Sequence, residues 1–327
     1  MLAMVLRHPG RPLEPVVLPE RSPGPGEIRV RVTACGVCRT DLHVVDGELD
    51  AAALPIIPGH EIIGRVDAVG DGVHHLKLGQ RVGIPWLGYT CGACLYCAMG
   101  RENLCDRPLF TGYTRDGGFA TAAIADARYA FDLGEAGEDA DLAPLLCAGL
   151  IGWRSLVMAG EGKLLGLYGF GAAAHIIVQV AVAQGRRVFA FTKPGDEKGQ
   201  AFARSLGAEW AGSSEEAPPV NLDAAILYAP NGRLVPIALA AVRKGGRVVC
   251  AGIHMSEIPA FRYDLLWGER ELVSVANLTC QDGRDFLVLA ASLRIKTHTV
   301  IYPLSDANRA LTNLRAGAFE GAAVLFP

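Results

Sequence analysis

The stretch KLLGLYGFGAAAH, residues 163–175, decides the fold class of this chain. An apolar segment runs into a glycine-rich turn that opens a helical pattern, and the turn has the spacing G-x-G-x-x-A. Glycines permit a tight turn and the approach of a pyrophosphate to the helix N-terminus, and a small third residue lets the helix pack closely on the strand. The pattern predicts a dinucleotide-binding turn at Gly169, Gly171, Ala172 and Ala174. A glycine turn without a ligand is the alternative.

Around this turn, continuous apolar runs alternate with helical segments. RRVFAF at 186–191, LDAAILYA at 222–229 and RVVCAG at 247–252 are such runs. Strands of this kind are buried on both faces of a sheet, and strands that alternate with helices favour parallel pairing. The middle of the chain therefore predicts an α/β fold with a doubly wound parallel sheet.

The two ends of the chain have a different sequence pattern. The first third reads as short strands between glycines and prolines, at Glu27–Ala34, Ile62–Gly70 and Gln80–Leu87. The last forty or so residues return to a helix and an edge strand, GAAVLFP at 321–327, expected to rejoin the β-rich first lobe. The predicted domains are 1–149 and 289–327, which form the β-rich part, and 150–288, which binds the dinucleotide.

Composition excludes several classes of function. The 327 residues are half hydrophobic, long enough for two cores, and the net charge of -3 gives no electrostatic footprint for nucleic acid or anionic lipid. No apolar stretch reaches the length of a membrane span, and the start of the chain lacks the apolar core of a signal peptide. We therefore expect a cytoplasmic protein with a small-molecule partner, and neither nucleic acid nor membrane as partners. In a reducing compartment, the spacing of the nine cysteines indicates their role.

Four cysteines form one dense cluster in the segment CGACLYCAMGRENLC. Cys91, Cys94, Cys97 and Cys105 have the spacing C-x2-C-x2-C-x7-C, which can place four thiolates around one tetrahedral Zn²⁺. A closed four-sulfur site leaves no position for substrate, so its predicted role is to fold a loop that has no core of its own. The alternatives are unrelated thiols, a pair of disulfides or an iron–sulfur cluster.

A second set of ligands is open. Cys38 in ACGVCRTDLH, His60 in PGHE and Cys147 in APLLCAGLIGW would leave a fourth zinc position free, as a catalytic site requires. Such a zinc would act as a Lewis acid on an alcohol. Asp41 and Glu61 are candidates for the carboxylate that accepts the other N–H of a metal-bound imidazole, or are ordinary surface or capping carboxylates. Taken one at a time, each of these three residues also fits the role of an ordinary buried side chain in the core.

CGVCRTDLH, PGHE, the four-cysteine segment, GYTRDGGFA and APLLCAGLIGW together resemble the zinc-containing alcohol dehydrogenases of the medium-chain dehydrogenase/reductase family, over nearly the whole chain and in the same order. The resemblance implies a GroES-like catalytic domain built from both chain ends, a Rossmann domain between them, two zinc ions per chain, NAD or NADP as cofactor, and a homo-oligomer. It implies that Cys38, His60 and Cys147 hold the catalytic zinc, with Glu61 behind it.

The same resemblance assigns roles to residues that carry no signal alone. Thr40 would take the substrate proton, and His43 would pass it through the cofactor ribose to solvent. Hydroxyl and imidazole suit these tasks, because a hydroxyl both donates and accepts and histidine titrates near neutral pH. Trp86 would line the pocket and favour small primary alcohols or aldehydes, or is a core tryptophan at a strand end.

The chain departs from the family pattern in three places. The acidic residue that selects NAD after the second Rossmann strand is replaced by Thr192 and Lys193, so NADP(H) is expected to be accepted and even preferred. Asp196 and Glu197 follow in the same loop and would restore NAD selectivity if they reached the ribose, and a solvated turn is the third reading. Ala322 follows Gly321 where relatives carry a basic residue, and Ala174 replaces the third glycine.

Two rival functions remain. One is another zinc-dependent member of the family, acting on polyols or cinnamyl-type aldehydes. The other is a catalytically silent nucleotide-binding relative, which would have no chemical need for an open site of two cysteines and one histidine.

Overall fold

The computed structural model describes residues 1–49 and 52–327, and it divides into two compact units. The first unit consists of Met1–Cys147, Asn277–Val288 and Lys296–Pro327, and the second of Ala148–Ala276 and Leu289–Ile295. Each unit has its own hydrophobic core, and the first core draws on residues from both chain ends, such as Leu6 and Leu325.

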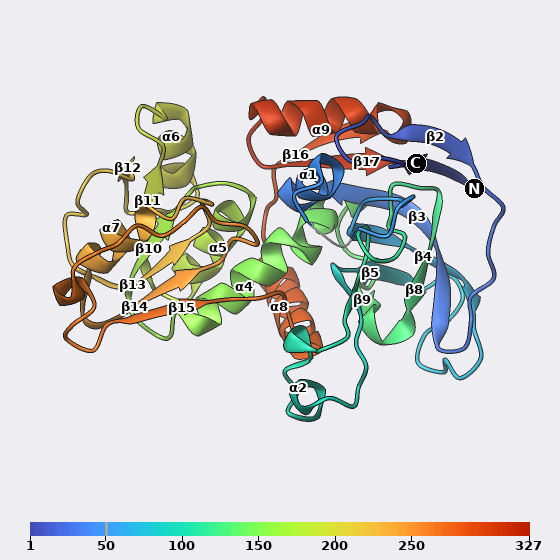
Figure 1. Cartoon of the computed structure of the whole chain (residues 1–327), viewed down its shortest axis with the longest axis horizontal. Coiled ribbons are helices and arrows are strands. Elements are labelled where there is room, and N and C mark those ends of the chain that lie inside the picture. Colours follow the sequence, from blue (N-terminus) through green and yellow to red (C-terminus); the bar gives the residue numbers. More distant parts are fainter. Residues whose placement is uncertain (50–51) are drawn as a thin grey trace. The chain divides into compact units, whose positions relative to one another are not determined.

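The first unit is organised around β3, which pairs antiparallel with β4, β8 and β17 (Figure 1). Its main sheet has the order β16-β17-β3-β4-β5-β9, with β8 on β3, and β1-β2 and β6-β7 form two small sheets. The strands are β1 (Leu2–Val5), β2 (Glu14–Val17), β3 (Glu27–Val37), β4 (Glu61–Val69), β5 (Arg81–Ile84), β6 (Leu87–Tyr89), β7 (Leu109–Phe110), β8 (Ala122–Asp126), β9 (Phe131–Asp132), β16 (Thr299–Pro303) and β17 (Ala322–Phe326).

Helices of the first unit are short, because turns and strand ends carry most of its chain. They are α1 (Arg39–Asp46), α2 (Leu95–Ala98), η1 (Glu102–Leu104), η2 (Ala127–Tyr129), α3 (Asp139–Leu142), η3 (Ala143–Leu146), η5 (Leu304–Asp306) and α9 (Ala307–Ala316); α8 (Cys280–Leu293) is shared with the second unit. Among the described residues no single helix has the length and apolar character to cross a bilayer; the bent pair 139–146 and 148–158 reaches that threshold only when the two are joined.

Two expectations about strands were wrong. Gln80–Leu87 is not one strand: β5 ends at Ile84 and β6 begins at Leu87, since Pro85 has no N–H to donate and the Trp86 carbonyl accepts instead from the Thr111 N–H at 2.8 Å. The C-terminal strand β17 is not an edge strand, because it lies between β16 and β3 and its residues Ala322–Leu325 are buried. The edge strand is β16, whose Ile301 is exposed. The expected return of the chain end to the first lobe is seen in the β17–β3 pairing.

The second unit contains one six-stranded sheet whose strand pairs are all parallel, in the order β12-β11-β10-β13-β14-β15. The α/β class with a doubly wound parallel sheet is thereby confirmed, and the order reverses beside β10, where such sheets bind ligands. The strands are β10 (Leu164–Tyr168), β11 (Arg187–Thr192), β12 (Trp210–Ser213), β13 (Leu222–Leu227), β14 (Val242–Cys250) and β15 (Glu271–Ser274). The helices are α4 (Ala148–Met158), α5 (Ala172–Ala183), α6 (Glu197–Ser205), α7 (Leu234–Ala241) and η4 (Tyr263–Leu265).

Candidate functional site

The open ligand set comes together in the first unit through strand register. Gly36 of β3 pairs with Glu61 of β4, so Cys38, just past the end of β3, lies beside His60, just before β4. Cys38 Sγ is 3.2 Å from His60 Nε2 and 3.8 Å from Cys147 Sγ, which lies at the end of η3. Donor atoms of these three residues and a Glu61 carboxylate oxygen all lie within 4.8 Å of one another.

Asp41 orients this cluster. Cys38 is the N-cap of α1, and its backbone N–H donates to Asp41 Oδ2 at 2.9 Å in a capping box. Asp41 Oδ1 accepts from the Gly59 N–H at 3.1 Å and from His60 Nδ1 at 3.0 Å. One buried carboxylate thus ties the first turn of α1 to the PGHE segment and turns His60 Nε2 toward the thiols. This is the contact that a metal-bound imidazole commonly makes with a carboxylate.

Electrostatics favour negative charge on Cys38. The Cys147 thiol donates to Cys38 Sγ, and with His60 nearby this lowers the pKa of Cys38 well below its usual range. The same contact, together with burial, raises the pKa of Cys147. Burial raises the pKa of Glu61, whose Oε2 is buried without a hydrogen-bond partner among the described residues. Two sulfurs and an imidazole nitrogen, with an unsatisfied carboxylate oxygen in the same group, fit a divalent zinc; its fourth position is open to substrate when Glu61 does not fill it.

Thr40 and His43 lie three residues apart on α1, so both lie on one side of the helix. Thr40 is buried in the first turn, and its backbone N–H donates to Cys38 Sγ at 3.3 Å. His43 lies in the last turn, where its Nδ1 contacts a carboxylate oxygen of Glu48. The sequence reasoning missed Glu48, because the contact depends on how the chain turns after α1.

Trp86 lies beside the candidate zinc ligands, in a group of aromatic rings. Its ring is edge-on to His60 at 5.0 Å and is stacked on Phe110 at 5.2 Å and Tyr113 at 5.6 Å. Tyr113 belongs to the GYTRDGGFA motif, yet no pattern in the sequence marked it or Phe110 as partners of Trp86. The aromatic wall forms when β6 pairs with β7.

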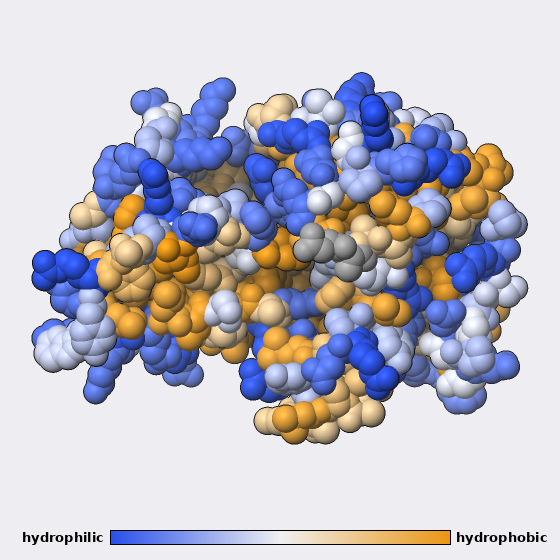
Figure 2. All heavy atoms as spheres, viewed as in Figure 1, coloured by the Kyte–Doolittle hydropathy of each residue, from blue (hydrophilic) through white to orange (hydrophobic). Residues whose placement is uncertain are grey.

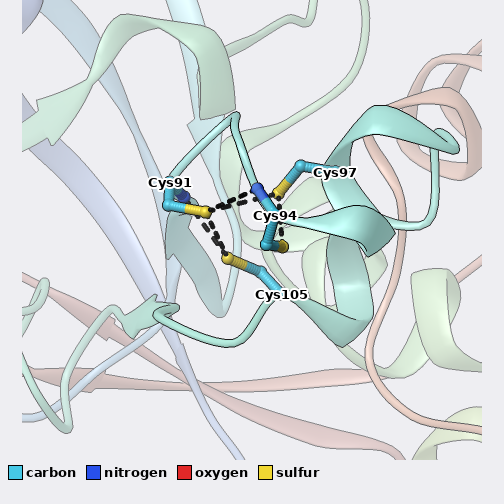
Figure 3. A group of neighbouring side chains, drawn as sticks. All are labelled: Cys91, Cys94, Cys97 and Cys105. Carbon is cyan, nitrogen blue, oxygen red and sulfur yellow. Dashed lines mark hydrogen bonds between the residues drawn. The ribbon is translucent and has the colours of Figure 1, made fainter.

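The four remaining candidate ligands gather in the segment that carries α2. Figure 3 shows the four side chains pointing toward one another; Cys105 Sγ is 3.5 Å from Cys91 Sγ, and Cys97 Sγ is 3.6 Å from Cys94 Sγ and 4.0 Å from Cys91 Sγ. Sulfurs at tetrahedral zinc, with bonds of ~2.3 Å, lie about 3.8 Å apart. All nine cysteines of the chain are free of disulfides, so these four are available as thiolates.

This lobe has little core of its own. Its helix α2 has no buried residue, and Leu95 and Met99 are 69% and 60% exposed. Figure 2 shows apolar atoms at the lower edge of the view, where Figure 1 labels α2. Backbone N–H groups stabilise the sulfurs: those of Ala93 and Cys94 lower the pKa of Cys91 to about 6. A zinc ion in this site would supply the folding energy that packing does not.

The glycine turn in the second unit meets the demands of a pyrophosphate. Gly169 has φ of 91°, and a Cβ there would lie 2.7 Å from the Ala229 backbone nitrogen, so only glycine fits. Gly171 is the N-cap of α5 and supplies no side-chain cap, which leaves N–H groups of the first turn, such as that of Ala172, for an anion. Ala174 is fully buried, as the packing argument required.

The second turn, after β11, is occupied by local contacts. Thr192 is buried, and its hydroxyl donates to the Gly212 carbonyl at 3.4 Å. Asp196 is the N-cap of α6, and its Oδ1 accepts from the Gly199 N–H at 2.9 Å. Lys193 is exposed. Among the charged residues considered for reading the ribose, Lys193 and Glu197 are exposed, and Asp196 is partly buried.

Comparison with known proteins places the chain in a family. Residues 24–135 match the alcohol dehydrogenase GroES-like domain. The probable alcohol dehydrogenase AdhA of Mycobacterium tuberculosis (strain CDC 1551 / Oshkosh) is 46% identical over 337 residues, covering 99% of this chain and 97% of the relative. This chain belongs to the zinc-containing alcohol dehydrogenases of the medium-chain dehydrogenase/reductase family.

Solved structures of similar proteins agree with this family. A thermostable alcohol dehydrogenase from Pyrobaculum aerophilum, with cobalt and zinc bound, superposes with a TM-score of 0.90 at 27% identity and covers 100% of this chain and 99% of its own. A cinnamyl alcohol dehydrogenase from Sorghum bicolor superposes with a TM-score of 0.90 at 26% identity, over 99% and 97% of the two chains. The chain described here is therefore an oxidoreductase, and its substrates are alcohols or aldehydes.

Proposed function

We propose that this alcohol dehydrogenase transfers a hydride between small primary alcohols or aldehydes and NAD(P)(H). It would hold one zinc ion with Cys38, His60 and Cys147 and a second with the four cysteines of the α2 lobe. The observation that carries the proposal is the His60 ring, fixed by Asp41 so that its Nε2 faces the two thiols. A zinc ion in the open site would act as a Lewis acid that makes a bound alcohol more acidic.

The chain's own residues would orient the metal ligands, bind the substrate and the cofactor, and move the proton. Asp41 holds the histidine ligand, and a Glu61 carboxylate oxygen lies within 4.8 Å of the ligand atoms. Thr40 would accept the substrate proton and His43 would deliver it to solvent, and the Trp86 ring would limit the size of the alcohol. The α5 N-terminus, with Gly169, Gly171, Ala172 and Ala174, would bind the pyrophosphate. Thr192 ends β11 and Lys193 follows it, at the place where the ribose would be read.

The domain assignment supports this division of tasks. We propose a GroES-like catalytic domain at 1–149 and 289–327 and a Rossmann domain at 150–288. A cytoplasmic location and a homo-oligomer, without nucleic acid or membrane as partners, accompany the proposal. A polyol or cinnamyl-type substrate is the second candidate, and the likeness to the sorghum cinnamyl alcohol dehydrogenase favours the cinnamyl type.

Metal analysis combined with turnover tests the proposal. The purified protein should contain two zinc ions per chain and should oxidise ethanol or reduce a small aldehyde with a nicotinamide cofactor. Cys147→Ala should abolish turnover and retain the lobe zinc and the fold, whereas Cys97→Ala should lose the lobe zinc and lower stability. A protein with full zinc and no turnover on any alcohol or aldehyde would be the silent relative instead.

A further inference from the structure

The turn after α1 brings Glu48 back to His43. Gly47 has φ of 76°, and its N–H donates to the Val44 carbonyl at 3.3 Å. The next N–H, of Glu48, donates to the His43 carbonyl at 2.9 Å. These two bonds make a Schellman motif, which places the Glu48 backbone directly beside His43. The motif depends on the glycine, because a Cβ on Gly47 would be 2.6 Å from Pro9 Cβ and the φ is left-handed.

Glu48 therefore holds His43 at two points. Its backbone N–H binds the His43 carbonyl, and its carboxylate contacts His43 Nδ1. The His43 side chain is 15% exposed and that of Glu48 is 48% exposed, so the pair lies where the protein meets solvent. A carboxylate at Nδ1 fixes both the ring plane and the tautomer: Nδ1 carries the hydrogen, and Nε2 is the nitrogen that can accept a proton.

We propose that Glu48 is a positioning residue for proton delivery by His43, an inference that rests on the proposed role of His43 as the relay histidine. His43 accepts a proton at Nε2 and becomes an imidazolium that still donates from Nδ1 to Glu48. The same proton then leaves Nε2 for water, and the neutral ring returns with Nδ1 protonated. The carboxylate keeps its charge throughout and prevents the ring from flipping its two nitrogens.

The other residues on this part of α1 do not offer the same contact. Asp46, on the last turn, binds Arg315 of α9 at 2.6 Å and so joins two helices at the surface. The C-terminus of α9 repeats the backbone motif without the side-chain pair: Gly317 has φ of 64°, and the Ala318 N–H donates to the Asn313 carbonyl at 3.0 Å. Asp46 and Gly317 therefore supply matched controls for charge and for backbone.

The test is a double-mutant cycle on steady-state alcohol oxidation. Glu48→Ala should lower kcat roughly 10-fold with little change in KM for the alcohol, which is a part of the roughly 10²- to 10⁴-fold that a positioned proton-transfer group contributes. Glu48→Asp should recover part of that loss. His43→Ala should lower kcat further, and adding Glu48→Ala to His43→Ala should change nothing more, because the two residues act as one unit. Asp46→Asn should keep wild-type kcat.

The same set of variants distinguishes a loss of stability from a loss of catalysis. Gly317→Ala and Gly47→Ala should both lower the thermal midpoint, and Gly47→Ala alone should lower kcat. If Glu48→Ala keeps wild-type kcat while His43→Ala lowers it, Glu48 has no positioning role. If His43→Ala also keeps wild-type kcat, the proposed relay itself is wrong. A kcat loss in Glu48→Ala that adds in full to that of His43→Ala would show that Glu48 acts independently of the histidine.

Discussion

Asp41 Oδ1 accepts a hydrogen bond from His60 Nδ1 at 3.0 Å, and this contact decides which imidazole nitrogen faces Cys38 and Cys147. The same carboxylate accepts from two backbone N–H groups, those of Cys38 and Gly59. The Asp41 carboxylate thus accepts three hydrogen bonds. It caps α1 through the Cys38 N–H, binds the backbone ahead of β4 through the Gly59 N–H, and orients the His60 ring. The candidate zinc site is therefore built into the fold of the first unit.

Asp41→Asn should weaken zinc binding at the open site by about 10- to 100-fold. The asparagine has one oxygen acceptor, and its NH₂ group would face an N–H donor that it cannot satisfy. Competition with a chelator, followed by elemental analysis, measures the effect, and the lobe zinc should be unaffected. Asp46→Asn, on the same helix but outside the site, should bind both ions as the wild type does. Equal zinc affinity in the two variants would contradict the orienting role of Asp41.

The lobe should release zinc on acidification in a defined range. The pKa of Cys91 is lowered from 9.0 to about 6 by the N–H groups of Ala93 and Cys94. A lowered pKa in the folded lobe stabilises it fully above the ordinary value of 9.0, and this contribution is lost as pH falls toward 6. Bound zinc would stabilise the thiolate further, so we expect Cys91 to hold the metal down to a pH below about 6. A coloured chelator measures the released zinc.

Cys280 provides the control for this pH dependence. Burial raises the pKa of its thiol to about 11, and it lies outside both ligand sets, so Cys280→Ser should leave the release profile unchanged. Cys91→Ser should release zinc at every pH tested. Zinc release from the wild-type lobe well above pH 6 would show that another thiol is protonated first, such as that of Cys97, whose pKa burial raises to about 11.

Sequence patterns predicted the candidate site better than its supports. The cysteine spacing and the PGHE motif are local in sequence, and the structure brings each set together. Whether Asp41 is a surface carboxylate or a ligand support depends on the register of β3 with β4, which pairs residues more than twenty positions apart. The inner position of β17 depends on β16 and β3, which lie about 260 positions apart in the sequence. Such pairing is set by packing of the whole unit, which periodicity in one segment does not encode.

A buried hydroxyl in the second unit should limit stability. Tyr168 is fully buried and stacked on Phe191 at 3.9 Å, and its hydroxyl has no hydrogen-bond partner among the described residues. Tyr168→Phe should raise the free energy of unfolding by about 1 kcal/mol, because it removes an unsatisfied polar group. Tyr228→Phe should lower it by about 1 kcal/mol, since that hydroxyl pairs with Ser155 Oγ at 2.9 Å. Denaturant unfolding compares the two, and opposite signs are required.

Substrate size should depend on Trp86, whose ring lies 5.0 Å from that of His60. Trp86→Phe should raise the ratio of kcat/KM for benzyl alcohol over ethanol about 10-fold, since each methylene admitted is worth ~1–3 kcal/mol. Trp210→Phe makes the same chemical change in β12 of the second unit and should leave the ratio as it is. An unchanged ratio in Trp86→Phe would make Trp86 a core residue only.

Cofactor preference is the last property that the second unit allows us to predict. Acidic residues after the second strand select NAD by binding the ribose hydroxyls and repelling a 2′-phosphate. Asp196 follows β11, but its carboxylate caps α6 through the Gly199 N–H at 2.9 Å, and the Thr192 hydroxyl is bound to the sheet. Neither is available in this arrangement to reject the phosphate. Two charged residues of this turn are exposed: Lys193 directly follows β11, and Glu197 lies further along the chain, in the first turn of α6. We therefore expect NADPH to be accepted and preferred over NADH.

Lys193→Ala should lower kcat/KM for NADPH about 10-fold, or about 1.4 kcal/mol, and should change that for NADH little. The lysine would pair with the 2′-phosphate as a point charge without the fork of an arginine, which is why the expected loss is moderate. Lys198→Ala removes an equal charge from α6 and is the matched control. Asp196→Ala should lower stability by about 1 kcal/mol as a lost N-cap and should leave the ratio of the two cofactors unchanged. A fall in NAD selectivity in Asp196→Ala would show instead that this carboxylate leaves the cap to bind the ribose. If the wild-type ratio of kcat/KM for NADPH over NADH is far below one and Lys193→Ala does not change it, Lys193 does not bind the 2′-phosphate.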